Sequence, residues 1–165
     1  MKMRALTLGL LGLAALGLAG CGFTPLYGTP GLTNSLSGIA VSAPQGRVGD
    51  LLREHLDDVL AHDRGLAPAY SMSLNVSEQR FPRGIRVDNV ASRYEYVLTA
   101  SYALTPTGGS TVVKRGNVRV EVTYDSSDQP YASVVAQQDA QDRAAEEAAR
   151  RIEVELAAWL IKPAG

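Results

Sequence analysis

Residues 94–104 read YEYVLTASYAL, and this stretch decides the fold. Its apolar side chains stand at every second position, which is the spacing of a strand with one buried face and one exposed face. Residues 70–76 and 118–124 alternate in the same way, and the segment 106–109, which reads PTGG, predicts a hairpin turn. We therefore expect three consecutive strands that form an antiparallel meander.

Two residues near the start of the last strand break this alternation. Lys114 and Gly116 occupy positions at which the pattern predicts buried apolar side chains. Lysine is almost never fully buried without a partner, and a glycine inside a strand often marks a bulge. The sequence predicts a bulge or a strand end near Gly116 rather than a buried lysine.

Two other segments have the periodicity of helices. Residues 48–60 place apolar side chains on one helical face and charged side chains on the other. From about residue 132 to residue 161 the chain has neither glycine nor proline and is rich in alanine, glutamate, glutamine and arginine, which predicts one long helix. Residues 36–41, closed by Pro44 and Gly46, are typical of a short first strand.

The order of these elements is strand, helix, three strands, helix. A strand, helix, strand start favours a parallel crossover, and two helices on one face of the sheet would bury every apolar stripe. We predict an α+β fold, a two-layer sandwich in which a four-stranded mixed sheet carries two helices on one face. Residues 36–165 suffice for a single domain with its own hydrophobic core.

The first twenty residues have the features of an export signal. Lys2 and Arg4 precede an apolar stretch that is too short and too rich in glycine for a stable membrane span. Residues 18–21, Leu-Ala-Gly-Cys, are typical of a lipobox, so residues 1–20 are predicted to be removed and Cys21 to be acylated. The alternative is an ordinary secretory signal with a chance cysteine there. Acylation would cap the chain's one cysteine, a thiol that has no intramolecular disulfide partner.

Residues 21–35 are predicted to be an acylated N-terminus and a flexible tether. After the cysteine this segment carries no charge but three glycines and two prolines, which favours extended chain over a packed element. Gly22 stands where an aspartate usually retains lipoproteins in the inner membrane, so the outer membrane is expected. The apolar residues of 23–27 are either incidental or a segment that docks on a partner or on the membrane surface.

Basic residues are concentrated in one region of an acidic chain. Without Lys2 and Arg4 the chain has 14 basic and 17 acidic residues, which argues against a nucleic-acid partner. Residues 79–119 nevertheless hold seven basic and only two acidic residues. Because guanidinium groups suit phosphate, this region is a candidate anion site, with solubilising surface charge as the alternative. The candidate ligands are Arg80, Arg83, Arg86, Arg93, Lys114 and Arg115.

An enzyme is not expected. His55 shares the apolar face of the first helix and is interpreted as a residue at the edge of the core, and His62 follows that helix. Two histidines seven apart do not make a metal site, and the paired carboxylates at 57–58 and 146–147 fit solvated helix faces. The sequence contains no nucleophile elbow, phosphate-binding loop or dinucleotide motif. We predict no catalytic residues, no metal and no cofactor.

The N-terminal run CGFTPLY (21–27), the element order and the closing Tyr131-Ala132 with its alanine-rich helix resemble the LPS-assembly lipoprotein family LptE. That resemblance implies a sheet covered by helices, a position inside the outer-membrane barrel LptD, and binding of lipopolysaccharide, a phosphorylated ligand that would suit the basic region. It also implies an outer-membrane lipoprotein that faces the periplasm and the barrel lumen. The remaining alternative is an auxiliary or carrier lipoprotein of another envelope lipid-transport system.

The second face of the predicted sheet fits the barrel interpretation. Its side chains are small, polar and largely uncharged, as a surface packed against the polar interior of a barrel would be. A plain solvated sheet face is the alternative. The residues are Ser71, Ser73, Asn75, Ser77, Thr99, Ser101, Ala103 and Thr123.

Overall fold

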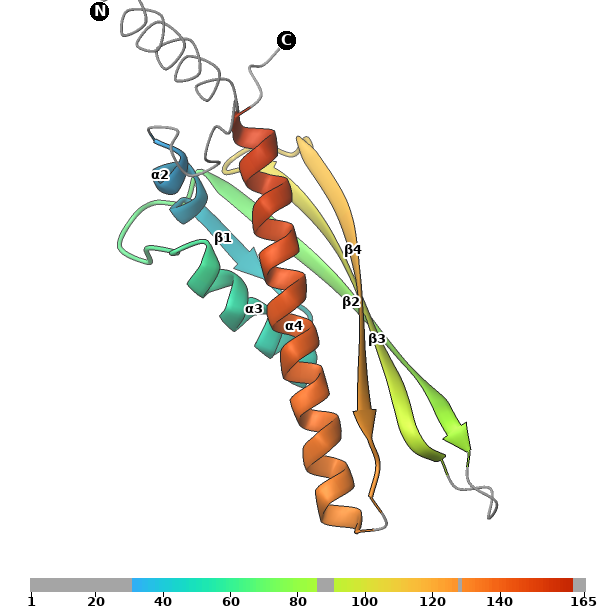
Figure 1. The fold of residues 1–165 in the computed structure, drawn as a ribbon. Coiled ribbons are helices and arrows are strands. Elements are labelled where there is room, and N and C mark those ends of the chain that lie inside the picture. The colour runs from blue at the N-terminus through green and yellow to red at the C-terminus, as the bar shows by residue number, and fades with distance from the viewer. Residues whose placement is uncertain (1–30, 86–90, 128, 162–165) are drawn as a thin grey trace, which may run out of the picture.

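The computed structural model describes residues 31–85, 91–127 and 129–161 (Figure 1). The predicted signal peptide, Cys21, the segment 23–27 and Arg86 lie outside the described residues. Within the described part, three helices and four strands follow one another along the chain: α2 (Leu32–Ser37), β1 (Ile39–Ser42), α3 (Arg47–Val59), β2 (Tyr70–Ile85), β3 (Ala91–Pro106), β4 (Lys114–Asp125) and α4 (Pro130–Ile161).

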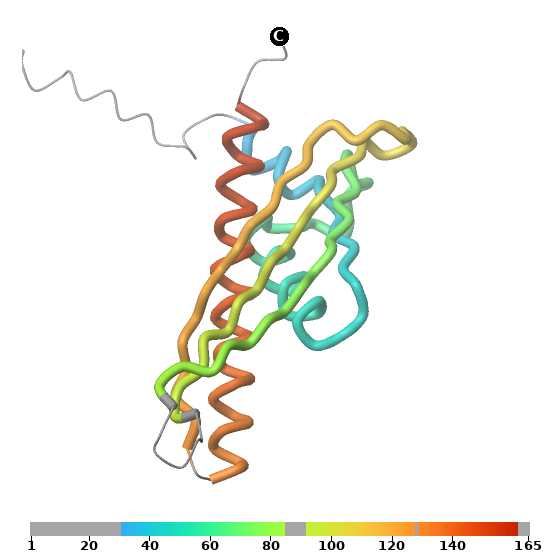
Figure 2. The backbone as a smooth tube through the Cα atoms, turned by 90° about the vertical axis from the view of Figure 1, so that its right-hand side faces the viewer, coloured from blue at the N-terminus to red at the C-terminus, as the bar shows by residue number. Residues whose placement is uncertain are grey.

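The four strands form one mixed sheet in the order β1-β2-β3-β4. β1 pairs with the start of β2 in parallel over four residue pairs, and α3 makes the crossover between them. β2, β3 and β4 pair antiparallel over most of their length, as the alternation predicts. Figure 2 shows this long meander running beside α4, with its far end extending beyond β1 and α3.

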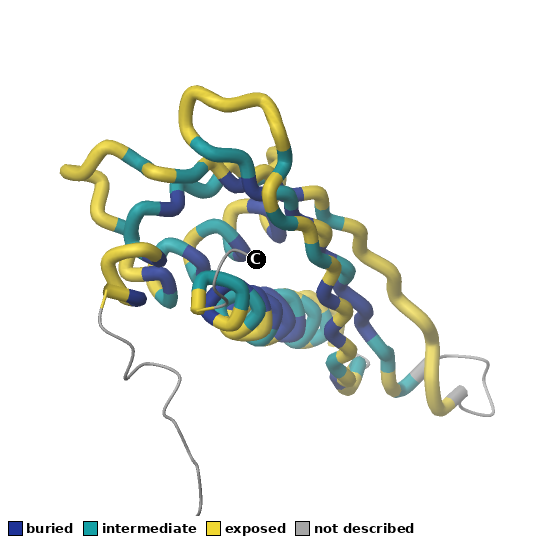
Figure 3. Tube along the Cα trace, turned by 90° about the horizontal axis from the view of Figure 1, so that it is seen from above, coloured by how far each residue is buried: buried dark blue, intermediate teal, exposed yellow. Residues whose placement is uncertain are grey.

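The helices cover one face of the sheet, and the buried residues belong to both the helices and the strands (Figure 3). The α+β two-layer prediction is therefore confirmed, with one helix more than expected. α4 begins with Pro130 in its first turn, where a missing N–H removes no helical bond. Its small buried residues allow it to approach both α3 and the sheet closely: Ala140, Ala144, Ala145, Ala148, Ala149 and Ala157. No helix in the described residues has the length and apolar character needed to cross a bilayer.

The extra helix corrects the prediction for residues 36–41. The strand begins only at Ile39, because residues 32–37 form the short helix α2. Leu32 and Leu36 stand one turn apart and are both buried in the common core. Thr33, Asn34 and Ser35 between them have weak helix propensity, so packing of the two leucines decides the conformation. Four residues of the predicted tether, 32–35, thus lie within a packed element.

Of the two alternatives predicted near Gly116, the strand end is confirmed, since β4 begins at Lys114, and the bulge is wrong. The pairing of β3 with β4 runs in regular register from Arg93 opposite Asp125 to Leu104 opposite Lys114. Gly116 lies opposite Tyr102, and a Cβ built on it would come within 2.4 Å of that tyrosine ring. The glycine is required because the ring of Tyr102 occupies the space that a side chain would need. Lys114 is half-buried on the helix side of the sheet.

Candidate functional site

The predicted anion-binding residues lie at opposite ends of the sheet. Arg83 and Arg93 stand opposite each other near the β2–β3 connection. Lys114 and Arg115 begin β4, where Arg115 lies opposite Ala103. Ten residues of β3 separate Arg93 from Ala103, which corresponds to about 33 Å of extended strand. The structure therefore does not bring these residues into one patch, and Arg86 lies outside the described residues.

At the β2–β3 end, two arginines are paired with carboxylates on the exposed face of the sheet. Arg83 lies 2.8 Å from Glu95, and Arg93 lies 2.8 Å from Asp125. The hydrogen bond from Arg93 to Asp125 raises the pKa of the guanidinium above its ordinary value. Exposed ion pairs of this kind contribute little to stability, but each carboxylate offsets the positive charge that a phosphate would meet.

Arg80 belongs to the opposite face of the sheet. Its Nη1 donates a hydrogen bond to Oε1 of Gln137 on α4 at 2.8 Å. Its guanidinium lies 4.9 Å from the ring centroid of Tyr94, which itself stacks on Tyr124. Such a cation–π contact contributes on the order of 0.5–1 kcal/mol at an exposed site. Arg80 thus links the sheet to α4 instead of joining Arg83 on a common surface.

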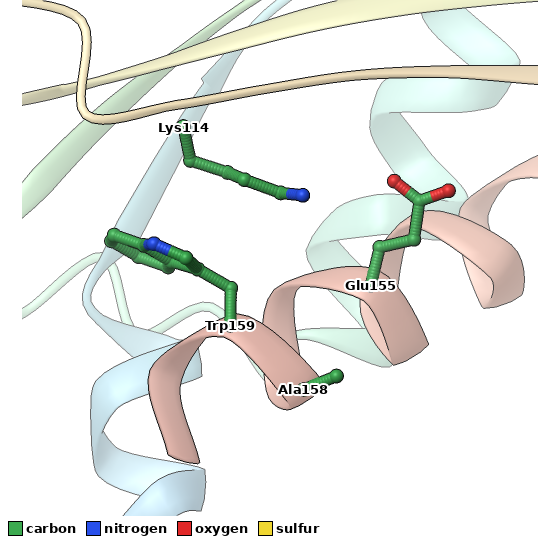
Figure 4. Close-up of a pocket in the computed structure, with 4 residues that line it drawn as sticks. All are labelled: Lys114, Glu155, Ala158 and Trp159. Carbon is green, nitrogen blue, oxygen red and sulfur yellow. The ribbon is translucent and has the colours of Figure 1, made fainter. Parts of the chain in front are cut away.

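Lys114 and Arg115 are different, because neither side chain forms a hydrogen bond or an ion pair within the described part of the chain. As neighbours on a strand they point to opposite faces of the sheet. Lys114 lines a pocket of about 240 Å³ between β4 and α4, together with Glu155, Ala158 and Trp159 (Figure 4). Arg115 lines a shallow hollow of about 280 Å³ on the polar face, with neighbours that include Ser73, Asn75, Ser101 and Ala103.

The pocket beneath Lys114 has well-fixed walls. The hydroxyl of Tyr102 donates a hydrogen bond to Oε2 of Glu155 at 2.6 Å. Burial, followed by this hydrogen bond, raises the pKa of Tyr102, so the hydroxyl stays protonated and keeps donating. The indole of Trp159 meets the ring of Tyr70 edge-on, with centroids 5.8 Å apart. Glu155 and Trp159 are four residues apart on α4, and therefore lie on one helical face.

The sequence indicated Lys114 but not its surroundings. Glu155 and Trp159 show helical spacing, but the sequence does not predict that this turn of α4 lies next to the start of β4. The one available signal was Gly116 among apolar positions, since it marks where the large ring of Tyr102 has to fit. The structure then places the hydroxyl of that tyrosine against Glu155.

The two histidines have structural partners. Nε2 of His55 lies 2.9 Å from Oδ1 of Asp142, which joins α3 to α4, and the ring is half-buried as expected at the edge of the core. Nδ1 of His62 donates to the backbone carbonyl of Ser37 at 3.1 Å, next to α2. Among the residues that the structure describes, no three His, Cys, Asp or Glu side chains are grouped as a metal site would require.

The outward face of the sheet is mostly polar, as predicted, but it also carries the apolar residues Val97, Ala103 and Phe81, of which Phe81 is 39% exposed. Ser71, Ser73, Asn75, Ser77 and Ser101 are exposed. Val97 also belongs to this face by position but is only 1% exposed, and it stands between Gln79 and Glu121 on the neighbouring strands. The longer polar side chains beside Val97 keep it from water, so the surface around it stays hydrophilic.

Comparisons with known proteins agree with one another. Residues 36–156 match the family model described as LptE, lipopolysaccharide-assembly. A crystal structure of a candidate lipoprotein from Caulobacter crescentus CB15 is 51% identical, with a TM-score of 0.70 over 81% of this chain and 99% of that one. No curated protein matches the chain.

Two more distant structures share the fold. The rare lipoprotein B from Shewanella oneidensis is 15% identical, with a TM-score of 0.57 over 74% of this chain and 94% of its own. A minor lipoprotein from Acinetobacter baumannii is also 15% identical, with a TM-score of 0.55 over 77% and 95%. At this identity the likeness concerns the architecture alone.

Proposed function

Because the chain belongs to the LptE family of lipopolysaccharide-assembly lipoproteins, we propose that it sits in the lumen of the outer-membrane barrel LptD as its plug and binds lipopolysaccharide on its way to the outer leaflet. The protein is an envelope lipoprotein of this assembly family, and its part is not that of an enzyme. The family match over residues 36–156 carries the proposal. The proposal includes anchoring at the outer membrane through Cys21.

The outward face of the sheet supports the plug role. Exposed small polar side chains on β2 and β3, flanked by charged side chains toward both ends of the sheet, present a hydrophilic surface of the kind that packs against the polar inner wall of a barrel. A domain held by acyl chains at Cys21 also stays at the membrane that contains its partner. We propose that this face, instead of the helix layer, meets the barrel wall.

Extraction of the full-length protein in mild detergent is expected to bring a large barrel protein with it. Asn75→Tyr adds bulk to the exposed sheet face without removing an internal hydrogen bond, so we expect it to reduce the recovered barrel at least fivefold. Asp58→Tyr makes the matched change on the exposed face of α3 and should leave recovery unaltered. Recovery of a transporter complex instead of a barrel would favour the auxiliary-lipoprotein alternative. If only Asp58→Tyr reduced recovery of the barrel, the contact with the barrel would be assigned to the helix layer.

Lipopolysaccharide binding is proposed to depend on the basic residues, and most strongly on the unpaired ones. In the described part of the chain no carboxylate pairs with Lys114 or Arg115, whereas Arg83 and Arg93 must leave Glu95 and Asp125 before they can bind a phosphate. A charge-assisted contact contributes about 1.5–3 kcal/mol when it is partly desolvated, which is tenfold or more in affinity. Lys114 and Arg115, one on each face of the sheet where β4 begins, are therefore the favoured phosphate contacts.

Two double variants with equal loss of charge test this assignment. We expect Lys114→Gln with Arg115→Gln to weaken lipopolysaccharide binding at least tenfold at low salt, and Arg83→Gln with Arg93→Gln to weaken it less than threefold. Binding should also fall as salt is raised, because exposed charges are screened. Unfolding temperature serves as the control and should not change. A larger loss in the Arg83, Arg93 variant would return the site to the β2–β3 end, with Arg80 and Arg86 as further candidates.

A further inference from the structure

The pocket between β4 and α4 holds two opposite charges that do not meet. Lys114 and Glu155 line the same space, but they form no ion pair with each other. Figure 4 shows Lys114 extending over the indole of Trp159, with its ammonium pointing toward the gap between the indole and Glu155. Lys114 is half-buried, and a partly desolvated cation without a partner is unfavourable. An anionic ligand group that enters the gap would pair with the ammonium and offset its desolvation.

The carboxylate opposite Lys114 is also available for binding. Its Oε2 accepts the hydrogen bond from Tyr102, so its position is fixed, while Oε1 remains free to accept another donor. The flat indole beside it is held by Tyr70. An ammonium group is stabilised both by a carboxylate and by the face of an indole. One side of the pocket thus suits an anion, and the other side suits a small cation.

We propose that this pocket binds a phosphoethanolamine group, with its phosphate at Lys114 and its primary ammonium at Glu155 and Trp159. Phosphoethanolamine is a compact zwitterion whose two charges are separated by two carbons, so it can bridge opposite charges that do not touch. The volume of about 240 Å³ is below the usual range for sites that enclose whole drug-sized ligands, roughly 300–1,000 Å³. The pocket therefore suits a head group and excludes a complete lipid.

The place of the pocket supports a ligand at the membrane surface. It lies at the end of the domain at which α2 begins and α4 ends (Figure 1). Ten residues lie between Cys21 and Leu32, and the eleven residue-to-residue steps of that segment span at most about 40 Å when fully extended. This step rests on the proposed acylation of Cys21. Phosphoethanolamine is present both in phosphatidylethanolamine and as a substituent of some lipopolysaccharides, so either could supply the group.

Trp159 is the one tryptophan of the chain, so its fluorescence reports on the pocket directly. The full-length protein in detergent is titrated with O-phosphoethanolamine, inorganic phosphate or ethanolamine. We expect O-phosphoethanolamine to change the emission at a concentration at least tenfold lower than either fragment requires. Equal responses to phosphate and O-phosphoethanolamine, or no response, would overturn the proposal.

Three single variants separate the two halves of the ligand. Lys114→Gln should weaken O-phosphoethanolamine binding at least tenfold. Glu155→Gln keeps an acceptor for Tyr102 but loses the charge, so it should bring O-phosphoethanolamine and phosphate to within twofold of each other. Arg119→Gln, on the same strand but on the other face, is the matched control and should leave the titration unchanged. The assignment would be contradicted if Glu155→Gln left the preference for O-phosphoethanolamine unaltered, or if Arg119→Gln weakened binding as much as Lys114→Gln.

The source of the group is then tested with vesicles and with lipopolysaccharide. Phosphatidylethanolamine vesicles are compared with phosphatidylcholine vesicles of the same net charge, whose methylated ammonium cannot donate to Glu155. Lipopolysaccharide with phosphoethanolamine is compared with lipopolysaccharide that lacks it. A selective response to either source supports the site and identifies the ligand, while a response to neither overturns it. Barrel recovery tests the proposed function separately: recovery without O-phosphoethanolamine binding removes this site and leaves that function intact.

Discussion

Replacing Gly49 with alanine is expected to lower the free energy of unfolding by about 3 kcal/mol or more. Gly49 is buried in the first turn of α3, and a Cβ placed on it would lie 2.1 Å from the carbonyl oxygen of Pro44. Alanine has the better helix propensity by about 1 kcal/mol, but the clash outweighs this gain because the obstacle is backbone. The helix would have to move away from the loop that follows β1. Urea unfolding followed by circular dichroism measures the change.

Gly38→Ala is the matched control for this prediction. Gly38 ends α2 with a φ of −81°, and the nearest atoms to a Cβ there would be 3.6 Å away. That is ordinary van der Waals contact, so we expect a change of less than about 1 kcal/mol. Similar losses for the two alanine variants would show that general sensitivity of glycine positions, rather than the approach of Pro44, is responsible.

Replacing Cys21 with serine is expected to abolish acylation and cleavage of the precursor. A hydroxyl cannot take the thioether-linked diacylglycerol, so the precursor should remain unacylated and keep residues 1–20. Several acyl chains hold a protein durably, at roughly 0.8 kcal/mol for each buried CH2. The mass of the purified protein reports both effects. A processed, membrane-held product from the serine variant would disprove the assignment.

Gly22→Asp makes a neighbouring change that should leave acylation intact. The mass of the mature protein should show cleavage before Cys21 and the same acyl chains as the wild-type protein. An aspartate after the acylated cysteine usually retains lipoproteins in the inner membrane. The variant should therefore move from the outer to the inner membrane and keep its acyl chains. Unaltered fractionation with the outer membrane would mean that Gly22 does not determine the location.

Periodicity predicted most of the fold because burial imposes it. The alternation of residues 94–104 places Tyr96, Leu98 and Leu104 in the core, and the stripe of 48–60 does the same for Leu52 and Leu56. The α2 helix escaped prediction because two turns are too few to show a period and its middle residues favour other conformations. Gly116 was misjudged for a different reason. A glycine that makes room for a ring on the next strand has the same local sequence as one that forms a bulge.

The basic region shows what a charge balance cannot predict. Arg80 and Arg83 are close in the chain, yet the first faces α4 and the second faces Glu95 across the sheet. Strand geometry determines those directions, and register determines which carboxylate stands nearby. The sequence identified the residues correctly as a group rich in positive charge. Only the paired strands reveal that Lys114 and Arg115 are the two of this group without partners in the described part of the chain.

The short strand β1 has a mechanical consequence. A force applied to the domain through its N-terminal segment reaches the structure at α2 and passes through Ile39 into four parallel residue pairs with β2. The meander of β2, β3 and β4 lies beyond those pairs and has far longer antiparallel registers. Under load we therefore expect α2 and β1 to detach from the domain first and to lengthen the tether, while the meander and α4 keep their shape. A pulling force on the N-terminus would then not be transmitted to the opposite end of the sheet.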